Sequence, residues 1–380
     1  MADKIRILYY YPCLHFDTGS PKALVNFIES LDGAVFEPVN CAAGDGPLTE
    51  ALTARGVEIV HGHVDSVTFR RPLAALAVIR RQAGLLKSWR IDVLHAHRLF
   101  WNTDLILAAW TLRIPVILHV HNPEAVAFQN LNRLVARKVL FCSRNVMENC
   151  GHLERIANKA EVLHNAIDTS AISRGSLIRA KLGLDDTDIA IGTVAQVVQR
   201  KGIDILIETA RILLGERSDL TFLVAGPTSP SEEEFCGRMR AAAEEPDLRG
   251  RVRFLGSRSD IPDFLASLDL FLLPTRADPF PVAVIEAMAA GLPAVVGKVG
   301  GIPEMLSSPE IGRLVEPLTP EAFAGAVREI LALPDRGRSM GANARLSLTG
   351  RFDMATAGER LKKIYLDVLR FRPSVCAGAN

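Results

Sequence analysis

The stretch Asp278-Pro-Phe-Pro-Val-Ala-Val-Ile-Glu286-Ala-Met-Ala-Ala-Gly291-Leu-Pro293 separates two acids by seven residues around a short helix. Asp278 is a good N-cap, Pro279 suits the first helical position, and Gly291 predicts the end of the helix before Pro293. The first-turn amides and the positive dipole end of such a helix favour an anion such as a diphosphate. We expect Asp278 to accept hydrogen bonds from sugar hydroxyls and Glu286 to hold a ribose diol. The alternative, which two acids alone would favour, is that Asp278 only caps the helix and Glu286 is only a carboxylate on the helix surface.

Short apolar runs alternate with helix-like segments along the whole chain, which is typical of parallel sheets. The first half contains Ile5–Tyr10, Val93–His95, Val116–Val120, Val139–Cys142 and Val162–Leu163. The second half contains Ile189–Val194, Thr221–Ala225, Arg253–Leu255, Leu270–Leu273 and Ala294–Val296. A length of 380 residues favours two domains. We predict an α/β fold with two doubly wound sheets, a hinge near 168–175 and an apolar-striped helix after Gly202.

Composition limits the function classes. The chain is 48% hydrophobic and 23% charged with a net charge of +1, so it is a folded protein and nucleic acid is a poor partner. The N-terminus has no apolar leader, and the apolar run 105–118 is broken by Arg113 and Pro115. We therefore expect a cytoplasmic protein without a membrane span. The six cysteines have no zinc-site spacing, which suits reduced thiols in a cytosolic core.

The chain resembles family 4 of the retaining glycosyltransferases, whose signature is two glutamates separated by seven residues in a similar helix. The resemblance extends in order through Val252–Gly256, Leu268–Pro274, Gly291–Pro293, Gly300–Glu304 and Gly312–Val315. It implies the GT-B architecture, in which two Rossmann-like domains face each other across a central cleft. The implied division is an acceptor-binding domain over 1–168, joined by a crossover helix at about 357–380, and a donor-binding domain over 169–356.

The family has an arginine and a lysine in the loop 195–202, and this loop predicts the basic partner of the donor diphosphate. Lys201 matches the lysine, whose charge offsets charge that develops on the leaving diphosphate. Gln196 stands where the arginine usually is and supplies no charge, so either Arg200 substitutes for it or the diphosphate is held with less electrostatic help. The alternative for Lys201 is a solvated lysine at a helix start.

Two departures from the family pattern reshape the expected donor pocket. Asp278 replaces the first glutamate and is one methylene shorter, and Pro281 replaces a glycine and has no amide hydrogen. Gly300 and Gly301 permit close backbone approach to a ligand, although an ordinary glycine turn is the alternative. The resemblance implies that the donor contacts also include Pro279, Phe280, Val282 and Glu286.

In the first half, the resemblance implies that a glycine-rich loop, Asp17-Thr18-Gly19-Ser20, lies close to the donor phosphate and the acceptor. His121 matches a histidine that contacts the donor sugar, so the predicted catalytic residues are Lys201, Asp278 and His121. Further motif positions imply acceptor or cleft residues, namely Ser20, His97 and Asn165.

The segment 66–90 is basic and contains no acid. Its Arg and Lys residues are flanked by Phe69 and Trp89, a composition that suits contact with an anionic membrane surface. The alternative is an ordinary surface helix whose Leu73, Leu76, Ala77 and Leu86 pack on the first sheet.

The resemblance implies a metal-independent, retaining hexosyltransferase-type enzyme that moves a sugar from a nucleotide diphosphate sugar to a glycan, lipid-linked or small-molecule acceptor. We expect no cofactor. Two alternatives remain open at this point. One is a sugar phosphorylase or nucleotide-sugar epimerase of the same fold, and the other is a degenerate sugar-nucleotide-binding subunit, which Gln196 and Asp278 would suit.

Overall fold

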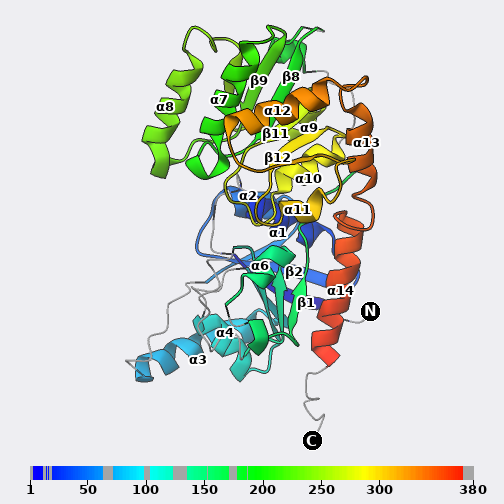
Figure 1. Cartoon of the computed structure of the whole chain (residues 1–380). Coiled ribbons are helices and arrows are strands. Elements are labelled where there is room, and N and C mark those ends of the chain that lie inside the picture. Colours follow the sequence, from blue (N-terminus) through cyan, green and yellow to red (C-terminus); the bar gives the residue numbers. More distant parts are fainter. Residues whose placement is uncertain are drawn as a thin grey trace, which may run out of the picture. The chain divides into compact units, whose positions relative to one another are not determined.

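The computed structural model describes residues 3–11, 14, 16, 19–62, 72–97, 103–122, 135–151, 153–170, 178–185 and 187–370. The predicted loop residues Asp17 and Thr18, the start of the basic segment (66–71), the hinge residues 171–175 and the tail 373–380 lie outside the described residues. The chain divides into two compact units (Figure 1). Residues 1–16, 20–165 and 355–380 form the N-terminal unit, and residues 17–19 and 166–354 form the C-terminal unit.

The N-terminal unit is built on a parallel sheet with the strand order β3-β2-β1-β4-β5-β6-β7. Its described strands are β1 (Ile5–Tyr10), β2 (Phe36–Ala42), β3 (Glu58–His61), β4 (Val93–Ala96), β5 (Val116–Val120), β6 (Lys138–Phe141) and β7 (Ala160–Val162). Its described helices are α1 (Gly19–Glu29), α2 (Pro47–Thr53), α3 (Pro72–Ser88), α4 (Thr103–Thr111), α6 (Arg144–Glu148) and α14 (Met354–Arg370). The strand order reverses between β1 and β4, as in a doubly wound fold.

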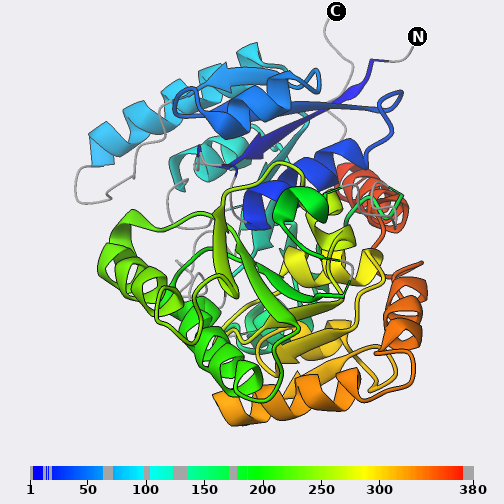
Figure 2. The same ribbon diagram turned by 90° about the horizontal axis from the view of Figure 1, so that it is seen from above.

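The C-terminal unit repeats this plan with the strand order β10-β9-β8-β11-β12-β13. Its strands are β8 (Ile189–Val194), β9 (Leu220–Ala225), β10 (Val252–Gly256), β11 (Leu270–Leu273), β12 (Ala294–Gly297) and β13 (Arg313–Val315). Its α-helices are α7 (Ile203–Leu214), α8 (Glu233–Ala243), α9 (Ile261–Ala266), α10 (Val282–Ala289), α11 (Ile302–Met305), α12 (Pro320–Leu331) and α13 (Arg338–Leu346). The neighbouring helices α7 and α8 are both drawn in green in Figure 2. The prediction of two doubly wound parallel sheets is confirmed.

Helix α7 confirms the predicted stripe after Gly202, because its apolar positions are buried at helical spacing. Three strands were missed. Strand β2 contains Pro38 and Asn40, which are typical of turns, and β3 and β13 are too short to show alternation. Among the described residues, no helix is long and apolar enough to cross a membrane.

Helix α3 has one buried face and one exposed face. Its buried residues are Ala75, Gln82 and Leu86, and Gln82 donates a hydrogen bond to Asp104 of α4. The opposite face exposes Leu73, Leu76, Ala77, Arg80 and Lys87. The alternative interpretation, in which these apolar residues pack on the first sheet, is therefore wrong for Leu73, Leu76 and Ala77, because 3.6-residue periodicity places them on the outer face, whereas Leu86 is buried.

Candidate functional site

The candidate site of the C-terminal unit lies where the strand order of its sheet reverses. Strands β8 and β11 are neighbours, but the chain leaves β8 toward β9 and leaves β11 toward β12. Loops that follow two such strands diverge and leave a crevice at the carboxyl edge of the sheet, where open α/β sheets bind ligands. The loop with Lys201 follows β8, and the loop with Asp278 follows β11. Topology thus brings together two residues that are far apart in sequence.

An ion pair joins these two loops. The Lys201 ammonium donates a hydrogen bond to the Asp278 carboxylate. Arg200 Nη1 lies 3.9 Å from the same carboxylate oxygen and donates to the Ala277 carbonyl at 2.8 Å. The side chains of Asp278 and Lys201 are 7% and 16% exposed, whereas that of Arg200 is 48% exposed. The site therefore holds a shielded cation beside one that solvent reaches.

Glycines allow the loops to pack backbone against backbone. Gly202 has φ +71°, and a Cβ there would overlap the Pro274 carbonyl oxygen. Gly300 follows β12, has φ +54°, and leaves no room for a Cβ beside the Asp278 carbonyl oxygen. L-residues with side chains rarely adopt these angles, so both positions require glycine. Close packing inside the unit thus accounts for Gly300, while the φ of Gly301, −85°, is one that any residue can adopt.

Sequence reasoning missed a set of residues that positions the Lys201 loop. Arg276 donates from its amide to the Arg200 carbonyl at 2.8 Å and from its side chain to the Gln199 carbonyl at 2.7 Å. Its guanidinium also forms a two-pronged pair with Asp204 at 2.7 and 2.6 Å, which raises the pKa of Arg276. The buried Thr275 hydroxyl lies 3.1 Å from the Arg200 carbonyl. An arginine two residues before Asp278, after an apolar strand, was the available signal.

The predicted start of the helix after Asp278 is wrong. Helix α10 begins at Val282 with Pro281 as its N-cap, and Asp278 makes an ion pair and does not cap the helix. Because a residue before proline is disfavoured in the helical region, Asp278 and Phe280 both resist helix formation, and Pro281 itself is extended with ψ 116°. The predicted end is confirmed, since Gly291 has φ +69° and follows the C-cap Ala290.

The remaining predicted donor residues differ in exposure. Phe280 and Val282 are buried, and the Phe280 ring packs edge-on against Phe352 with centroids 5.4 Å apart. Pro281 is also buried. Four predicted donor residues are half-buried, namely Gln196, Pro279, Glu286 and Gly300. A donor contact from Phe280 would therefore use its backbone rather than its ring.

In the N-terminal half, the two described residues of the predicted glycine-rich loop lie in a helix. Gly19 and Ser20 form the first turn of α1 and do not form a loop. Pro21 lies in the same turn, where the absence of an N–H costs no hydrogen bond because first-turn N–H groups have no intrahelical acceptor. The Ser20 hydroxyl lies 2.8 Å from the Tyr11 hydroxyl, which follows β1. Asn165, another predicted cleft residue, is 5% exposed.

The two predicted histidines of the N-terminal unit are in direct contact. His97 Nδ1 lies 3.0 Å from His121 Nε2, and the two rings stack with centroids 5.2 Å apart. His97 is buried, whereas His121 is half-buried. Two further histidines, His95 and His119, extend this stack and were not among the predicted site residues.

Two surface hollows lie at the amino ends of the strands, at the edge of each sheet away from the carboxyl ends. One, with a volume of about 600 Å³, is lined by residues before β11 and β12, including Leu268, Asp269 and Pro293. The other, of about 580 Å³, is lined by residues before β1 and β4, including Lys4 and Asp92. Because ligands of doubly wound sheets bind at carboxyl ends, neither hollow is the candidate site.

Two family models match consecutive parts of the chain. The model described as Glycosyltransferase Family 4 matches residues 19–171, and the model described as Glycosyl transferases group 1 matches residues 176–347. The second match contains the Lys201 and Asp278 loops.

Individual proteins agree with these matches. A D-inositol 3-phosphate glycosyltransferase from Segniliparus rotundus is 26% identical over 78% of this chain and 71% of its own length. A glycosyltransferase from Rickettsia africae superposes with a TM-score of 0.84 at 19% identity, covering 97% of this chain and 100% of that one. The crystal structure of Anabaena Alr3699/HepE in complex with UDP-glucose gives a TM-score of 0.77 at 20% identity, covering 96% and 100% of the two chains.

Proposed function

Because the chain belongs to the group 1 glycosyltransferases with a Family 4 N-terminal part and has the GT-B fold, we propose that it is a retaining, metal-independent enzyme that uses a nucleotide diphosphate sugar. The observation that carries this proposal is the Lys201–Asp278 pair at the carboxyl edge of the C-terminal sheet. Transfer of a sugar is the activity of the family. The donor class, the stereochemistry and the independence from metal are our inference.

In the proposed reaction, Lys201 stabilises the leaving diphosphate. Its charge is offset by Asp278 in the unliganded protein, and a donor diphosphate supplies a second anion beside it. Negative charge grows on the bridging oxygen as the bond between the sugar and the phosphate breaks, so an ammonium held there stabilises the transition state more than the ground state. Arg200 is the second proposed cation, and the amides at the start of α10 are the proposed uncharged donors.

Asp278 and Glu286 are proposed to bind the two sugars of the donor. The Asp278 carboxylate has further acceptor positions besides the one that Lys201 uses, so it can accept hydrogen bonds from the transferred sugar. Glu286 lies on α10 two turns beyond and is the proposed partner of the ribose diol. His121 is proposed to contact the transferred sugar, as the family resemblance implies.

We propose that the acceptor attacks the face from which the diphosphate departs. The acceptor oxygen forms the new bond to the anomeric carbon, the bond to the phosphate oxygen breaks, and the acceptor proton passes to that phosphate oxygen. This order retains the anomeric configuration. It uses the protein for positioning and charge stabilisation, and the Lys201 and Arg200 side chains supply the positive charge in place of a divalent cation.

A lipid-linked acceptor suits the outer face of α3. Leu73 and Leu76 are 84% and 43% exposed, and Arg80 and Lys87 continue the same face toward the end of the helix. Exposed leucines beside basic residues fit the interface of an anionic bilayer, where each basic residue contributes about 1 kcal/mol. We propose a cytoplasmic protein that is peripheral on the inner face of the membrane. Glycan and small-molecule acceptors stay open, since the relative from Segniliparus is named for inositol 3-phosphate.

The family match does not favour a phosphorylase or an epimerase. A degenerate binding subunit is the second candidate, because Gln196 stands where the family has an arginine. Turnover separates the two: a binding subunit shifts its melting temperature with a nucleotide sugar but forms no product with any acceptor.

The test begins with a thermal-shift screen of UDP, GDP, ADP and their sugar conjugates, since a ligand at 100 times its Kd stabilises by about 2.7 kcal/mol. The selected donor is then incubated with acceptors of the three classes, with and without EDTA, and the product is examined by NMR. A product with the donor's anomeric configuration and a rate insensitive to EDTA supports the proposal. An inverted product, or activity abolished by EDTA and restored by Mg²⁺, contradicts it.

A further inference from the structure

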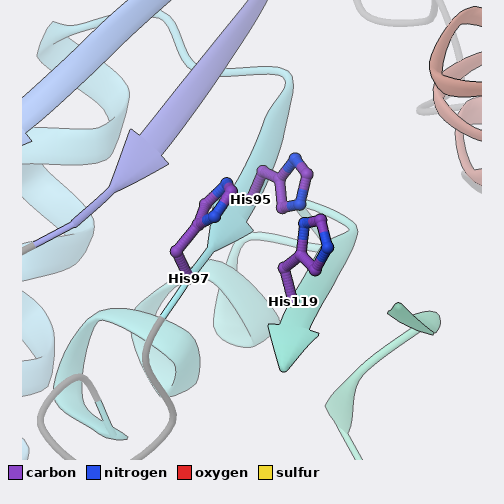
Figure 3. A group of neighbouring side chains, drawn as sticks. All are labelled: His95, His97 and His119. Atoms are coloured by element: carbon purple, nitrogen blue, oxygen red, sulfur yellow. The ribbon is translucent and has the colours of Figure 1, made fainter. Parts of the chain in front are cut away.

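The imidazoles of the N-terminal unit form a cluster because of strand register. Strands β4 and β5 are parallel neighbours in which His95 pairs with Ile117 and Ala96 pairs with Leu118. Residues two apart on a strand share a face, so His95, His97 and His119 all project from the same side of the sheet. The His97 amide continues the ladder by donating to the Tyr10 carbonyl at 3.0 Å. Figure 3 shows the three side chains grouped at the ends of these two strands.

The nitrogen atoms of this cluster lie close together in a place that is buried from bulk solvent. One ring nitrogen from each of His95, His97 and His119 lies within 4.8 Å of those of the other two. The residues are 0%, 2% and 0% exposed. Nε2 of His95, Nε2 of His97 and at least one nitrogen of His119 are buried and have no hydrogen-bond partner among the described residues. An unpaired buried polar atom costs about 1–3 kcal/mol, so three of them on neighbouring rings call for an explanation, such as a ligand that binds there.

Neighbouring groups orient the rings for a ligand at this point. His95 Nδ1 lies 2.7 Å from the Tyr365 hydroxyl, which in turn lies 2.7 Å from the Tyr9 hydroxyl. His97 Nδ1 lies 3.0 Å from His121 Nε2. When each Nδ1 donates its hydrogen to these partners, each Nε2 keeps its lone pair for a ligand. Metal-binding histidines usually have such a partner on the other ring nitrogen.

Burial also favours the neutral form of the three rings, which is the form that binds metal ions. Burial lowers the pKa of each of the three histidines well below its usual range, and neighbouring imidazoles lower it further. The backbone of Leu163 opposes this shift at His119 only in part. Neutral imidazole is the commonest metal ligand in proteins and suits zinc, copper, iron and nickel.

We propose that His95, His97 and His119 bind one divalent transition-metal ion, with Zn²⁺ as the best fit to a compact set of three imidazoles. A water molecule or hydroxide completes four-coordination, as in other three-histidine zinc sites. The ion ties β4 to β5 and pairs the buried ring nitrogens. The proposed transfer chemistry uses Lys201 and Asp278 of the C-terminal unit and shares with this site only the contact of His97 with His121, which is proposed to contact the transferred sugar. Metal retention is measured without a nucleotide sugar, so failure of one proposal is distinguishable from failure of the other.

The first test measures metal binding by the full chain, purified without a metal-affinity column and freed of metal with a chelator. Zn²⁺ is titrated by calorimetry and the bound metal is counted by mass spectrometry after dialysis. Co²⁺ is used as a coloured probe, because nitrogen-ligated tetrahedral Co²⁺ absorbs visible light strongly. We expect one ion per chain, a visible Co²⁺ spectrum and a higher melting temperature. Absence of retained metal overturns the proposal and leaves buried water as the occupant.

Variants separate this site from adventitious binding. His119→Gln removes one ligand and is expected to abolish retention of the ion. His61→Gln is the matched control, because His61 is an exposed histidine of the same unit beside Asp45. Equal metal retention in wild type and in folded His119→Gln protein, or loss of retention only in His61→Gln, overturns the proposal.

A gentler variant covers the case in which His119→Gln does not fold. Tyr365→Phe keeps all three imidazoles and removes only the hydroxyl at His95 Nδ1. Loss of such a partner typically weakens metal affinity about 10–100-fold, which is the expected result here. If the Tyr365→Phe protein binds Zn²⁺ with unchanged affinity, the three-histidine assignment is wrong.

Discussion

The two units present their polar groups differently although both are doubly wound parallel sheets. In the C-terminal unit, Lys201 and Asp278 lie on loops beyond β8 and β11 and form a shielded ion pair, and solvent reaches the neighbouring Arg200, which is 48% exposed. In the N-terminal unit, His95 and His119 lie within β4 and β5 and are neutral and buried. A loop beyond a strand can place a charge at a crevice, whereas a strand residue faces a covering layer.

Because of this difference, we expect substitutions in one region to affect mainly ligand binding and substitutions in the other to affect mainly folding stability. Removing a charge at a partly solvated loop affects mainly a bound anion, because water can hydrate what remains. Removing a partner inside the histidine cluster leaves buried polar atoms unpaired, and the cost falls on folding. Substitutions in the two regions should therefore differ in which measurement responds.

The largest effect is expected from Lys201→Ala. Loss of the cation at the leaving diphosphate should lower kcat about 10²–10³-fold, or about 2.7–4 kcal/mol, as for other groups that stabilise developing charge. Asp278 keeps Arg200 at 3.9 Å as a second cation, so the melting temperature should fall less than it would for a carboxylate left without any partner. The matched control is Lys298→Ala, which removes a lysine paired with Glu316 in the same unit. Equal rates for the Lys201→Ala and wild-type proteins would remove Lys201 from the mechanism.

Gly300→Ala should be the most destabilising of the single substitutions considered for the C-terminal unit. Alanine at φ +54° costs about 1–3 kcal/mol, and the overlap of its Cβ with the Asp278 carbonyl adds to that cost. Chemical denaturation measures the loss. Gly237→Ala is the control, since Gly237 lies in the middle of α8 with open space around it and alanine there should stabilise by about 0.5–1 kcal/mol. If Gly300→Ala leaves the free energy of unfolding unchanged, the loops after β11 and β12 can adjust to the added Cβ.

Tyr365→Phe probes the buried cluster in the absence of metal. The substitution leaves the Tyr9 hydroxyl and His95 Nδ1 without their partner, at an expected cost of about 1–3 kcal/mol. Denaturation in a chelating buffer measures this cost. Tyr11→Phe is the control, because the half-buried Ser20 partner of Tyr11 can bond to water and the loss should be smaller. If both variants lose equal stability, the cluster is not a special point of the fold.

The sequence predicted the fold because the signals are local and repeated. Apolar runs at β1, β5, β8 and β11 coincide with the strands, and the stripe after Gly202 coincides with α7. The helix predicted at about 357–380 overlaps α14, which begins three residues earlier at Met354 and is described to Arg370. Strand β2 escaped notice because Pro38 and Asn40 interrupt its apolar pattern.

The site could be predicted only where one motif or one loop contained it. Lys201 and Asp278 were identified as site residues, and the structure adds that they pair directly. Arg276 and the histidine cluster depend on contacts between segments that are distant in the chain, and the β4–β5 register decides which histidines meet. The N-cap assigned to Asp278 failed because two prolines delay the start of α10.

The smallest effect is expected on the exposed face of α3, which lies outside the two regions compared above. The question is whether the basic residues of this face bind anionic lipid. Arg80→Ala should weaken binding to vesicles containing anionic phospholipid by about 1 kcal/mol, or roughly fivefold, at low salt. Arg249→Ala removes an exposed arginine of the C-terminal unit and is the control for net charge. Sedimentation with vesicles measures both. An equal loss in the two variants would mean that net charge alone attracts the protein to lipid, whereas a loss confined to Arg80→Ala that disappears in neutral vesicles assigns the contact to α3. Because Leu73 and Leu76 share this face, binding that persists at high salt would add an apolar contribution to the electrostatic one.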